Sequence, residues 1–546
     1  MKSISSIIVA VTALAFAGAG PQDLKSASGE PVQPAVSPRS HAVSAAHSRV
    51  DADDPSGPPP ASPQGSKAVP SKSSAKSTQA VSSPSEDTGL HHERGLEDNP
   101  KDPFAPPGYK PPTRPTRAEL PPILAKLKRL AYVSIDPRHG TTAVGDGGRY
   151  RLTEDDVVAL AALPNLGRLW LGGGVISERA AEALAKNPGL VSLSISLHGP
   201  TVGDEDVRMI AKLPKLRSLD LSQSSVTSVG LAYLKGHAAL RELNLEATRV
   251  GDAGMEAISG NENLTSLNVR ATRVDDSGMV YIGKLRHLRS LSVGPNVSND
   301  ALAAIEGLVE LEEFWGPVHM SDAGLGHLRN MTKLRRLAAG LGLVTDDGLR
   351  SIRGLIRLEG LNLQLSKITD KGMEYVGEMG GLLELRLDLT KITDAGMTPV
   401  ANLKHLQILG CRHTQIGDAA LVPIGTLPEL ECLNLDGTRV TSAGMKSLTR
   451  LSSLRVLDLT GTRVHDEGMT YVAKLPHLRT LYVTQTAVGD AGLEKLAGMT
   501  GREVNITAYQ TKVTQRGASL LRQRNIGVSY EFNPPPVRER NDSTIP

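Results

Sequence analysis

RLDLTKITDAGM, residues 386–397, establishes the architecture of this chain because close copies of it recur. GLNLQLSKITDKGM at 360–373, NLDGTRVTSAGM at 434–445 and DLTGTRVHDEGM at 458–469 follow one template, L-x-x-L-x-L-x-x-T-x-V-x-D-x-G-M. A fixed period in the twenties is typical of a solenoid, in which stacked units bury one another's apolar faces. The first leucine of the template recurs every 24 residues in two series: Leu216, Leu240, Leu264 and Leu288, then Leu358, Leu382, Leu406, Leu430, Leu454 and Leu478.

Each repeat divides into two halves with different periodicities. The first half alternates apolar and polar residues, as at Leu433 and Leu435, which predicts a short strand with one buried face. The second half, such as ITDAGMTPVANL at 392–403, has apolar residues at the spacing of a helix. Thr393 is expected to cap this helix, and Asp394 to lie against the positive end of its dipole.

Two small residues recur at fixed places in the template. Glycine inside the first helical turn costs about 1 kcal/mol relative to alanine, so we expect the neighbouring coil to leave no room for a side chain there. The glycines are Gly254, Gly278, Gly324, Gly348, Gly372, Gly396, Gly444, Gly468 and Gly492. After the strand, a buried threonine hydroxyl can bond to the backbone of the turn. The threonines are Thr248, Thr272, Thr390, Thr414, Thr438, Thr462 and Thr486.

The repeats resemble those of leucine-rich repeat proteins. Their I/V-T/G-D-x-G turn is most similar to a subclass that includes F-box substrate receptors, secreted bacterial effectors of the GALA type and many bacterial extracytoplasmic proteins. Threonine stands where many such families carry Asn or Cys. The resemblance covers roughly residues 120–530 and implies an α/β fold, a curved leucine-rich repeat solenoid with a parallel sheet on the concave face and helices on the convex face. We expect about 16 strands, from 133–135 to 504–506, and a candidate last strand at 526–528.

The ends of the chain differ from the repeats. Residues 1–20 combine Lys2, a short apolar run and A-x-A sites, the layout of a secretory signal peptide, with an uncleaved anchor as the alternative. Residues 21–117 hold 18 of the 35 prolines and predict a disordered Pro/Ser-rich linker. The repeat domain is predicted at 118–532, with about 16 repeats and atypical end caps, before a disordered tail at 533–546. No later stretch is long and apolar enough to span a bilayer, so we expect a secreted, periplasmic or envelope-associated protein.

The predicted strands also indicate a binding face. Side chains on either side of a buried strand leucine should point out from the concave face, and both tryptophans of the chain fall there. Exposed aromatic residues and arginines are favoured at interfaces. Trp315 has a second interpretation, because Gly316 stands where a strand leucine belongs and Trp315 could fill the gap. The predicted partner contacts are Trp170, Asp220, Asn244, Arg270, Trp315, Arg336, Arg386, Arg412, Asp458 and Tyr482.

A second column of charges lies in the loop from strand to helix. The cations are Arg249, Arg273, Lys367, Lys391, Arg439, Arg463 and Lys512. Three residues after five of them stand Asp252, Asp276, Asp370, Asp394 and Asp466, and Asp490 occupies the same place in its own repeat. The favoured interpretation is a salt-bridged loop edge. The alternative is a cationic ladder that grips an anionic polymer.

Motifs for catalysis are missing from the sequence. It contains no G-x-S-x-G, P-loop or dinucleotide fingerprint. No spacing of His, Cys or carboxylates predicts a metal site, and no cofactor is expected. Cys411 should face the core and Cys432 the opposite side, which disfavours a disulfide between them. A net charge of +3 over 546 residues does not indicate a nucleic-acid partner.

Three functions remain as hypotheses. The first is a non-enzymatic, exported binding scaffold whose concave face takes a protein or peptide ligand. The second is binding of an anionic envelope glycan along the basic loop column. The third, implied by the family resemblance, is a ubiquitin-ligase-type substrate receptor or effector, although a proline-rich linker stands where an F-box would lie.

Overall fold

The computed structural model describes the following residues: 152–163, 166–171, 176–195, 202–340, 342–499, 503–524, 526–530 and, for the backbone alone, 132–135 and 142–145. All of them belong to one unit of the chain, residues 108–546. The predicted signal peptide (1–20), linker (21–117) and C-terminal tail (533–546) lie outside the described residues.

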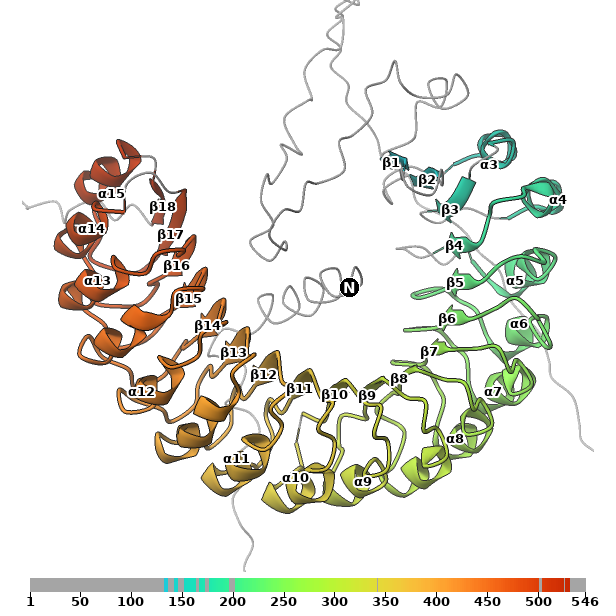
Figure 1. The fold of residues 1–546 in the computed structure, drawn as a ribbon. Coiled ribbons are helices and arrows are strands. Elements are labelled where there is room, and N and C mark those ends of the chain that lie inside the picture. The colour runs from blue at the N-terminus through green and yellow to red at the C-terminus, as the bar shows by residue number, and fades with distance from the viewer. Residues whose placement is uncertain are drawn as a thin grey trace, which may run out of the picture. The chain divides into compact units, whose positions relative to one another are not determined.

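The strands of the described residues form one 18-stranded sheet, in which each strand pairs with its neighbours in the sequence (Figure 1). Every pair is parallel except β1 (Tyr132–Ile135) with β2 (Thr142–Gly145). The repeat template did not predict β2, since TAVG lacks its leucines. The other strands are β3 Leu166–Trp170, β4 Ser192–Ser194, β5 Ser218–Asp220, β6 Glu242–Asn244, β7 Ser266–Asn268, β8 Ser290–Ser292, β9 Glu313–Trp315, β10 Arg336–Ala338, β11 Gly360–Asn362, β12 Glu384–Arg386, β13 Ile408–Gly410, β14 Cys432–Asn434, β15 Val456–Asp458, β16 Thr480–Tyr482, β17 Val504–Ala508 and β18 Ile526–Tyr530.

Helical segments line the convex side of this unit, opposite the sheet (Figure 1). The α-helices are α3 Glu154–Ala161, α4 Glu178–Lys186, α5 Asp204–Ile210, α6 Ser228–Ala232, α7 Asp252–Ile258, α8 Asp276–Ile282, α9 Asp322–Gly326, α10 Asp346–Ile352, α11 Asp370–Val376, α12 Leu421–Ile424, α13 Asp466–Val472, α14 Asp490–Leu496 and α15 Gln515–Arg522. Among the described residues, three segments are 3₁₀ helices, namely η2 Asp300–Ile305, η3 Ala395–Asn402 and η4 Gly444–Arg450. The helix predicted over 392–403 is thus a 3₁₀ helix, and Pro399 within it cannot donate an α-helical hydrogen bond.

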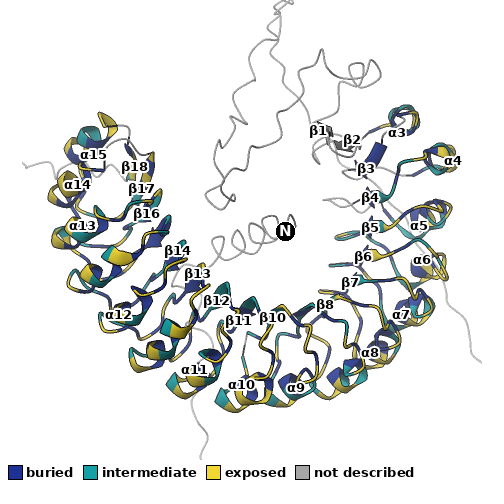
Figure 2. Cartoon of the chain, viewed as in Figure 1, coloured by how far each residue is buried: buried dark blue, intermediate teal, exposed yellow. Residues whose placement is uncertain are grey.

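The core lies between the sheet and the helical segments. One coil contributes Leu385 and Leu387 from its strand, Ile392 from its turn, and Met397 and Val400 from its helical half, all with 0% of their surface exposed. Figure 2 shows this buried interior continuing from coil to coil while the exposed residues lie outside it. Burying each such side chain contributes about 1.5–3 kcal/mol, so aliphatic residues alone can build the core of a chain with 3% aromatic residues.

The turn after each strand is closed by the predicted threonine ladder. Thr390 Oγ donates to the Leu387 carbonyl at 2.6 Å, and Leu389, directly before Thr390, takes a left-handed backbone with φ of 59°. Its amide donates to the Arg412 carbonyl of the next coil at 2.7 Å. The same hydroxyl bond, at 2.6 or 2.7 Å, is made by Thr248, Thr272, Thr414, Thr438, Thr462 and Thr486. This confirms the predicted role of the column.

Neighbouring coils are joined by an aspartate at the start of each helical half. Asp370 Oδ1 accepts the Thr393 amide at 2.8 Å, and Oδ2 accepts the Thr393 hydroxyl at 2.6 Å. Thr393 Oγ in turn accepts the Ala395 amide at 3.4 Å, but the N-cap of η3 is Asp394, one residue later than predicted. The same two bonds join Asp204 to Thr227, Asp322 to Thr345, Asp346 to Thr369, Asp418 to Thr441 and Asp490 to Thr514.

This aspartate also explains the recurring glycine. A Cβ placed on Gly372 would lie 2.5 Å from Asp346 Oδ1, and one on Gly492 would lie 2.6 Å from Asp466 Oδ1. Real Cβ atoms essentially never approach another heavy atom so closely. The prediction that the neighbouring coil excludes a side chain is confirmed at most of these glycines, where the excluding group is a carboxylate. Asn299 takes its place at Gly324, whereas at Gly254 and Gly468 the nearest atom belongs to a valine of the same coil.

Candidate binding surface

The side chains that flank each buried strand residue form the concave face. On β12, for example, Glu384 and Arg386 lie on either side of fully buried Leu385. Parallel pairing places equivalent residues of successive strands in register, so Arg386 stands beside Asn362 of β11 and Gly410 of β13. The concave face therefore presents columns of side chains at the strand spacing of about 4.8 Å.

At the N-terminal end of this face lie Trp170, Asp220 and Asn244. Trp170, on β3, is 37% exposed. Asp220 and Asn244 are half-buried, and their side-chain oxygens accept the amides of Ser222 and Glu246 at 2.9 and 3.1 Å. Each of these side chains thus bonds to the backbone at the end of its own strand, and only part of its polar surface is available to a partner.

The middle of the face contains Arg270, Trp315 and Arg336. Arg270 is exposed, whereas Arg336 forms an ion pair with Glu313 of the neighbouring strand. Trp315 is half-buried on β9. The space left by Gly316 is taken by fully buried Met320, whose methyl and sulfur atoms lie where a side chain on Gly316 would be. The interpretation that Trp315 fills this gap is therefore wrong.

Toward the C-terminal end, charged residues gather into what we call the C-terminal cluster, which consists of Glu384, Arg386, Asp388, Arg412, Asp436 and Asp458. Arg386 Nε donates to Glu384 Oε1 at 2.6 Å, and the Arg386 side chain is 17% exposed. Asp388 accepts the Arg412 amide at 2.7 Å and the Gln364 side-chain amide. Most of this polar surface is thus already satisfied within the protein.

Arg412 and Asp436 form an ion pair, with Nε and Oδ2 2.6 Å apart. The two groups are poorly oriented for a hydrogen bond, because buried Arg412 Nε has no acceptor at proper geometry. We regard the pair as a charge contact, since the distance alone supports Coulombic attraction. The Arg412 side chain is 41% exposed, so part of its guanidinium remains open to solvent.

Asp458 departs from the prediction. It occupies the expected outward column, but only 6% of its surface is exposed. Its Oδ1 accepts the Thr460 amide at 2.9 Å, and its register neighbour is Tyr482 of β16. Asp458 thus lies low in the concave face, and a small part of its surface is open to solvent.

Burial shifts the protonation of this cluster. It raises the pKa of the Asp458 carboxyl, the bonds from Thr460 act to lower it, and the nearby Asp436 charge raises it further. Burial likewise raises the pKa of Asp388, against the lowering effects of the Arg412 amide and the Arg386 charge. For Arg386, burial acts to lower the pKa, but Glu384 and Asp388 outweigh it and the pKa rises. Arg386 therefore stays charged, whereas the ionised forms of both aspartates are disfavoured.

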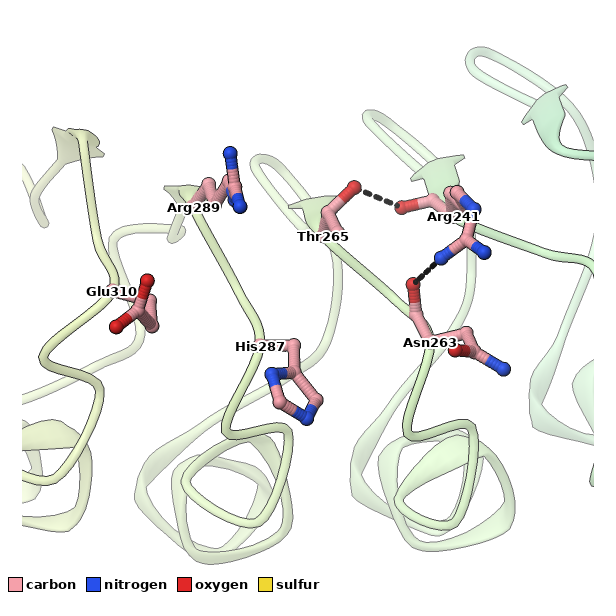
Figure 3. Close-up of a pocket in the computed structure, with 6 residues that line it drawn as sticks. All are labelled: Arg241, Asn263, Thr265, His287, Arg289 and Glu310. Carbon is pink, nitrogen blue, oxygen red and sulfur yellow. Dashed lines mark hydrogen bonds between the residues drawn. The ribbon is translucent and has the colours of Figure 1, made fainter.

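A feature that sequence reasoning missed lies at the edge where the strands begin. A hollow of about 260 Å³ is lined by Arg241, Asn263, Thr265, His287, Arg289 and Glu310, shown in Figure 3. A second, of about 500 Å³, is lined by Glu312, Lys333, Arg335, Arg357, Glu359 and Gly381. Ion pairs of 2.6 Å join Lys333 to Glu310 and Arg335 to Glu359. The signal in the sequence was the arginine that recurs directly before the strands, as at Arg241, Arg289 and Arg335.

The opposite edge does not carry the predicted salt bridges. Within the described parts of the chain, none of the seven cations from Arg249 to Lys512 pairs with a neighbouring aspartate. The reason is that each of these aspartates already accepts an amide of the next coil. The pairs are Asp252 with Asp275, Asp276 with Ser298, Asp370 with Thr393, Asp394 with Gly417, Asp466 with Gly489 and Asp490 with Thr514.

The two cysteines and the possible metal ligands remain to be considered. Cys411 is buried in the core and half-buried Cys432 lies on the concave face, and both are free thiols. Burial raises the pKa of Cys432 to about 12, so it is protonated at neutral pH. Across the described ranges, no three His, Cys, Asp or Glu side chains come together as metal ligands would. In those ranges, too, every helix is too short or too polar to cross a bilayer.

The repeat pattern agrees with a known family. The family described as "Leucine Rich repeat" matches residues 238–259, 260–283, 450–473 and 474–497. Together with the single sheet of parallel strands and the stacked helical halves, this match defines the fold as an α/β leucine-rich repeat solenoid.

Several solved structures are similar to this chain. An internalin from Listeria monocytogenes is 23% identical, with 61% of this chain and 89% of the internalin covered and a TM-score of 0.48. A leucine-rich repeat protein of Leptospira interrogans is 18% identical over 70% of this chain and 93% of that chain, with a TM-score of 0.45. The ectodomain of the Arabidopsis receptor kinase HAESA, in complex with a peptide hormone ligand, is 16% identical over 65% and 68%, with a TM-score of 0.39. No curated protein sequence matches the chain.

Proposed function

We propose that this protein is a non-enzymatic, exported scaffold whose concave face binds a protein or peptide partner. The observation that carries the proposal is the placement of Trp170, Trp315 and Tyr482 on that face, in a chain with 3% aromatic residues. Large aromatic side chains bury much area at small entropic cost and recur at the centres of interfaces. Export, and with it an extracytoplasmic location, is proposed from the composition of residues 1–20.

The geometry of the sheet supports a peptide-like ligand. Side chains repeat at about 4.8 Å across the strands, so an extended segment lying across them meets a new column at each coil. The surroundings of Trp315 and Tyr482 mix both charge signs, with Arg336 and Glu313 near one and the C-terminal cluster near the other. Such a surface favours a polar polypeptide over a uniformly charged polymer.

The two alternatives have weaker support. The cations from Arg249 to Lys512 are exposed and free of salt bridges in the described structure, which suits an anionic glycan. However, the six aspartates of the same edge keep its net charge small. A ubiquitin-ligase-type receptor would depend on residues outside the described part of the chain.

The test is binding of a displayed random-peptide library to the full-length chain. Trp170→Ala, Trp315→Ala and Tyr482→Ala should each weaken the selected peptides at least tenfold, the size of an interface hot spot. Tyr233→Ala is the matched control, because Tyr233 is 45% exposed at the end of α6 on the convex side. Equal binding by all four variants, with unchanged circular dichroism, would place the ligand elsewhere.

Arg386 is a poor probe for this purpose. Replacing it with alanine leaves Glu384 and Asp388 without their cation, and an uncompensated buried charge destabilises the fold itself. Loss of binding by that variant would therefore not separate contact from unfolding.

A further inference from the structure

Three neighbouring strands place apolar side chains in one outward column of the concave face. Ile408, Cys432 and Val456 are register partners on β13, β14 and β15, and we call them the apolar stripe. Ile408 and Cys432 are half-buried, and Val456 is 6% exposed. From β4 to β12 and on β16 and β17 this column is polar or glycine, with Ser192, Ser218, Glu242, Ser266, Ser290, Glu313, Arg336, Gly360, Glu384, Thr480 and Asn505. The stripe is therefore a local break in an otherwise hydrophilic column.

The neighbouring column has a glycine beside the stripe. Gly410 stands between Arg386 and Asn434, and a Cβ there would lie 3.1 Å from both Asp388 carboxylate oxygens. The second outward position of β13 thus carries no side chain, and the Asp388 carboxylate packs closely against the buried glycine. At the far end, half-buried Tyr482 bounds the patch, since its phenol lies within electrostatic reach of Asp458 and Cys432.

Acidic side chains outnumber basic side chains around the apolar stripe. The C-terminal cluster contains four carboxylates and two arginines, and each arginine is already engaged, Arg386 with Glu384 and Arg412 with Asp436. In the described structure no cation lies within ion-pair distance of Asp458, and the Asp436 charge adds to the unfavourable burial of its carboxylate. A cation brought by a ligand would relieve this excess of negative charge.

We propose that the apolar stripe and the C-terminal cluster form a subsite for a partner peptide that carries an apolar side chain close to a lysine or arginine. This inference rests on the proposed function and names the chemistry of the partner. Two positions along a strand span about 7 Å, which is the offset between Val456 in the stripe and Asp458 in the cluster. An apolar residue and a basic residue two positions apart match that offset where an extended peptide segment turns to run parallel to β15 instead of crossing the strands.

The subsite can be tested with three pools of synthetic peptides of equal length, titrated against the full-length chain by fluorescence anisotropy. One pool has Leu-x-Arg at fixed positions, the second Leu-x-Glu and the third Ser-x-Arg. The Leu-x-Arg pool should bind at least tenfold more tightly than the other two. A preference for Leu-x-Glu, or no preference among the pools, would overturn the inference.

Single substitutions test which residues of the subsite cause the preference among the peptide pools. Asp458→Asn, which keeps an acceptor for the Thr460 amide, should reduce the preference for arginine over glutamate at least fivefold. Ile408→Ser should reduce the preference for leucine over serine, whereas Ser266→Asn, in the same column of the N-terminal half, should change neither. If Trp170→Ala and Trp315→Ala weaken all pools but Asp458→Asn and Ile408→Ser have no effect, the subsite is wrong and the concave-face function stands. If none of these variants alters binding, both proposals fail.

Discussion

At the scale of single residues, a glycine in most coils is dictated by an aspartate of the coil before it. The carboxylate occupies the place of a glycine Cβ because it must reach the amide that begins the next helical half. Local helix propensity would favour alanine at this position. The contact between coils therefore outweighs the local preference.

Gly372→Ala should lower the stability of the solenoid by about 1–3 kcal/mol, since the added methyl overpacks against Asp346 and Leu349. Gly354→Ala is the matched control, because nothing lies within 4 Å of a Cβ there. That change should be neutral or stabilise by up to about 1 kcal/mol. Urea denaturation followed by circular dichroism measures both, and equal stabilities of the two variants would contradict the crowding argument.

Sequence spacing predicted the roles of the threonine and glycine columns, but it predicted the wrong partners for the aspartates. It placed Asp370 opposite Lys367, three residues earlier, because only neighbours in the sequence were visible. The actual partner, Thr393, lies 23 residues away and becomes adjacent only after the coils stack. Partners across coils follow from the stacking geometry, which the repeat period implies without naming the contacts.

At the scale of the element, the start of each helical half depends on the preceding coil. Asp370→Ala removes both acceptors for Thr393 and leaves its amide unsatisfied, at a cost of about 1–3 kcal/mol. Amide hydrogen exchange of Thr393 should accelerate, while that of Thr369, served by Asp346, should not change.

Asp370→Asn provides the control for this junction. An asparagine oxygen can still accept the amide, and the structure already contains such a case, since Asn299 Oδ1 accepts the Ser321 amide at 2.8 Å. Exchange at Thr393 should therefore stay close to that of the unaltered protein. Equal acceleration by the alanine and asparagine variants would show that charge, rather than the acceptor, matters.

The sequence pattern could not predict whether a helical half forms an α-helix or a 3₁₀ helix. The coils beginning at Thr369 and Thr393 share the template, yet α11 is an α-helix and η3 is a 3₁₀ helix. Apolar spacing identifies the buried side of both. The difference depends on details such as Pro399, which removes one backbone donor.

At the scale of the whole molecule, stability is shared between adjacent coils, so a defect in the middle should separate the two ends. Phe314 is fully buried in β9, beside the irregular position of Gly316. Phe314→Ala should cost about 3–5 kcal/mol through the cavity it creates. Denaturation monitored by hydrogen exchange should then show the coils on either side unfolding in separate steps.

Leu169→Ala, near the N-terminal end of the array, is the comparison. It removes a similarly buried side chain from β3 but leaves most of the stack continuous. Only the terminal coils should lose protection. A single concerted transition in both variants would mean that the array behaves as one cooperative body.

The sequence pattern predicted which strand residues face outward, but it did not predict how much of each side chain is exposed. Alternation along the strand correctly assigned Arg386, Asp458 and Tyr482 to the outward columns. It could not show that Asp458 is 6% exposed, or that Arg386 is occupied by Glu384, because both depend on side chains of neighbouring strands. The hollows beside Arg241 and Arg335 escaped notice because their lining comes from several coils at once.

The aspartate-to-threonine link has a consequence for how such a chain evolves. Asp346 serves Thr369, and Asp370 serves Thr393, through identical bonds, so the junctions that carry this pair are interchangeable with one another. A gene segment encoding one coil can be duplicated or lost, and the new neighbours still fit. Descendants can thereby change the reach of their ligand-facing surface by whole coils, without inventing a new interior each time.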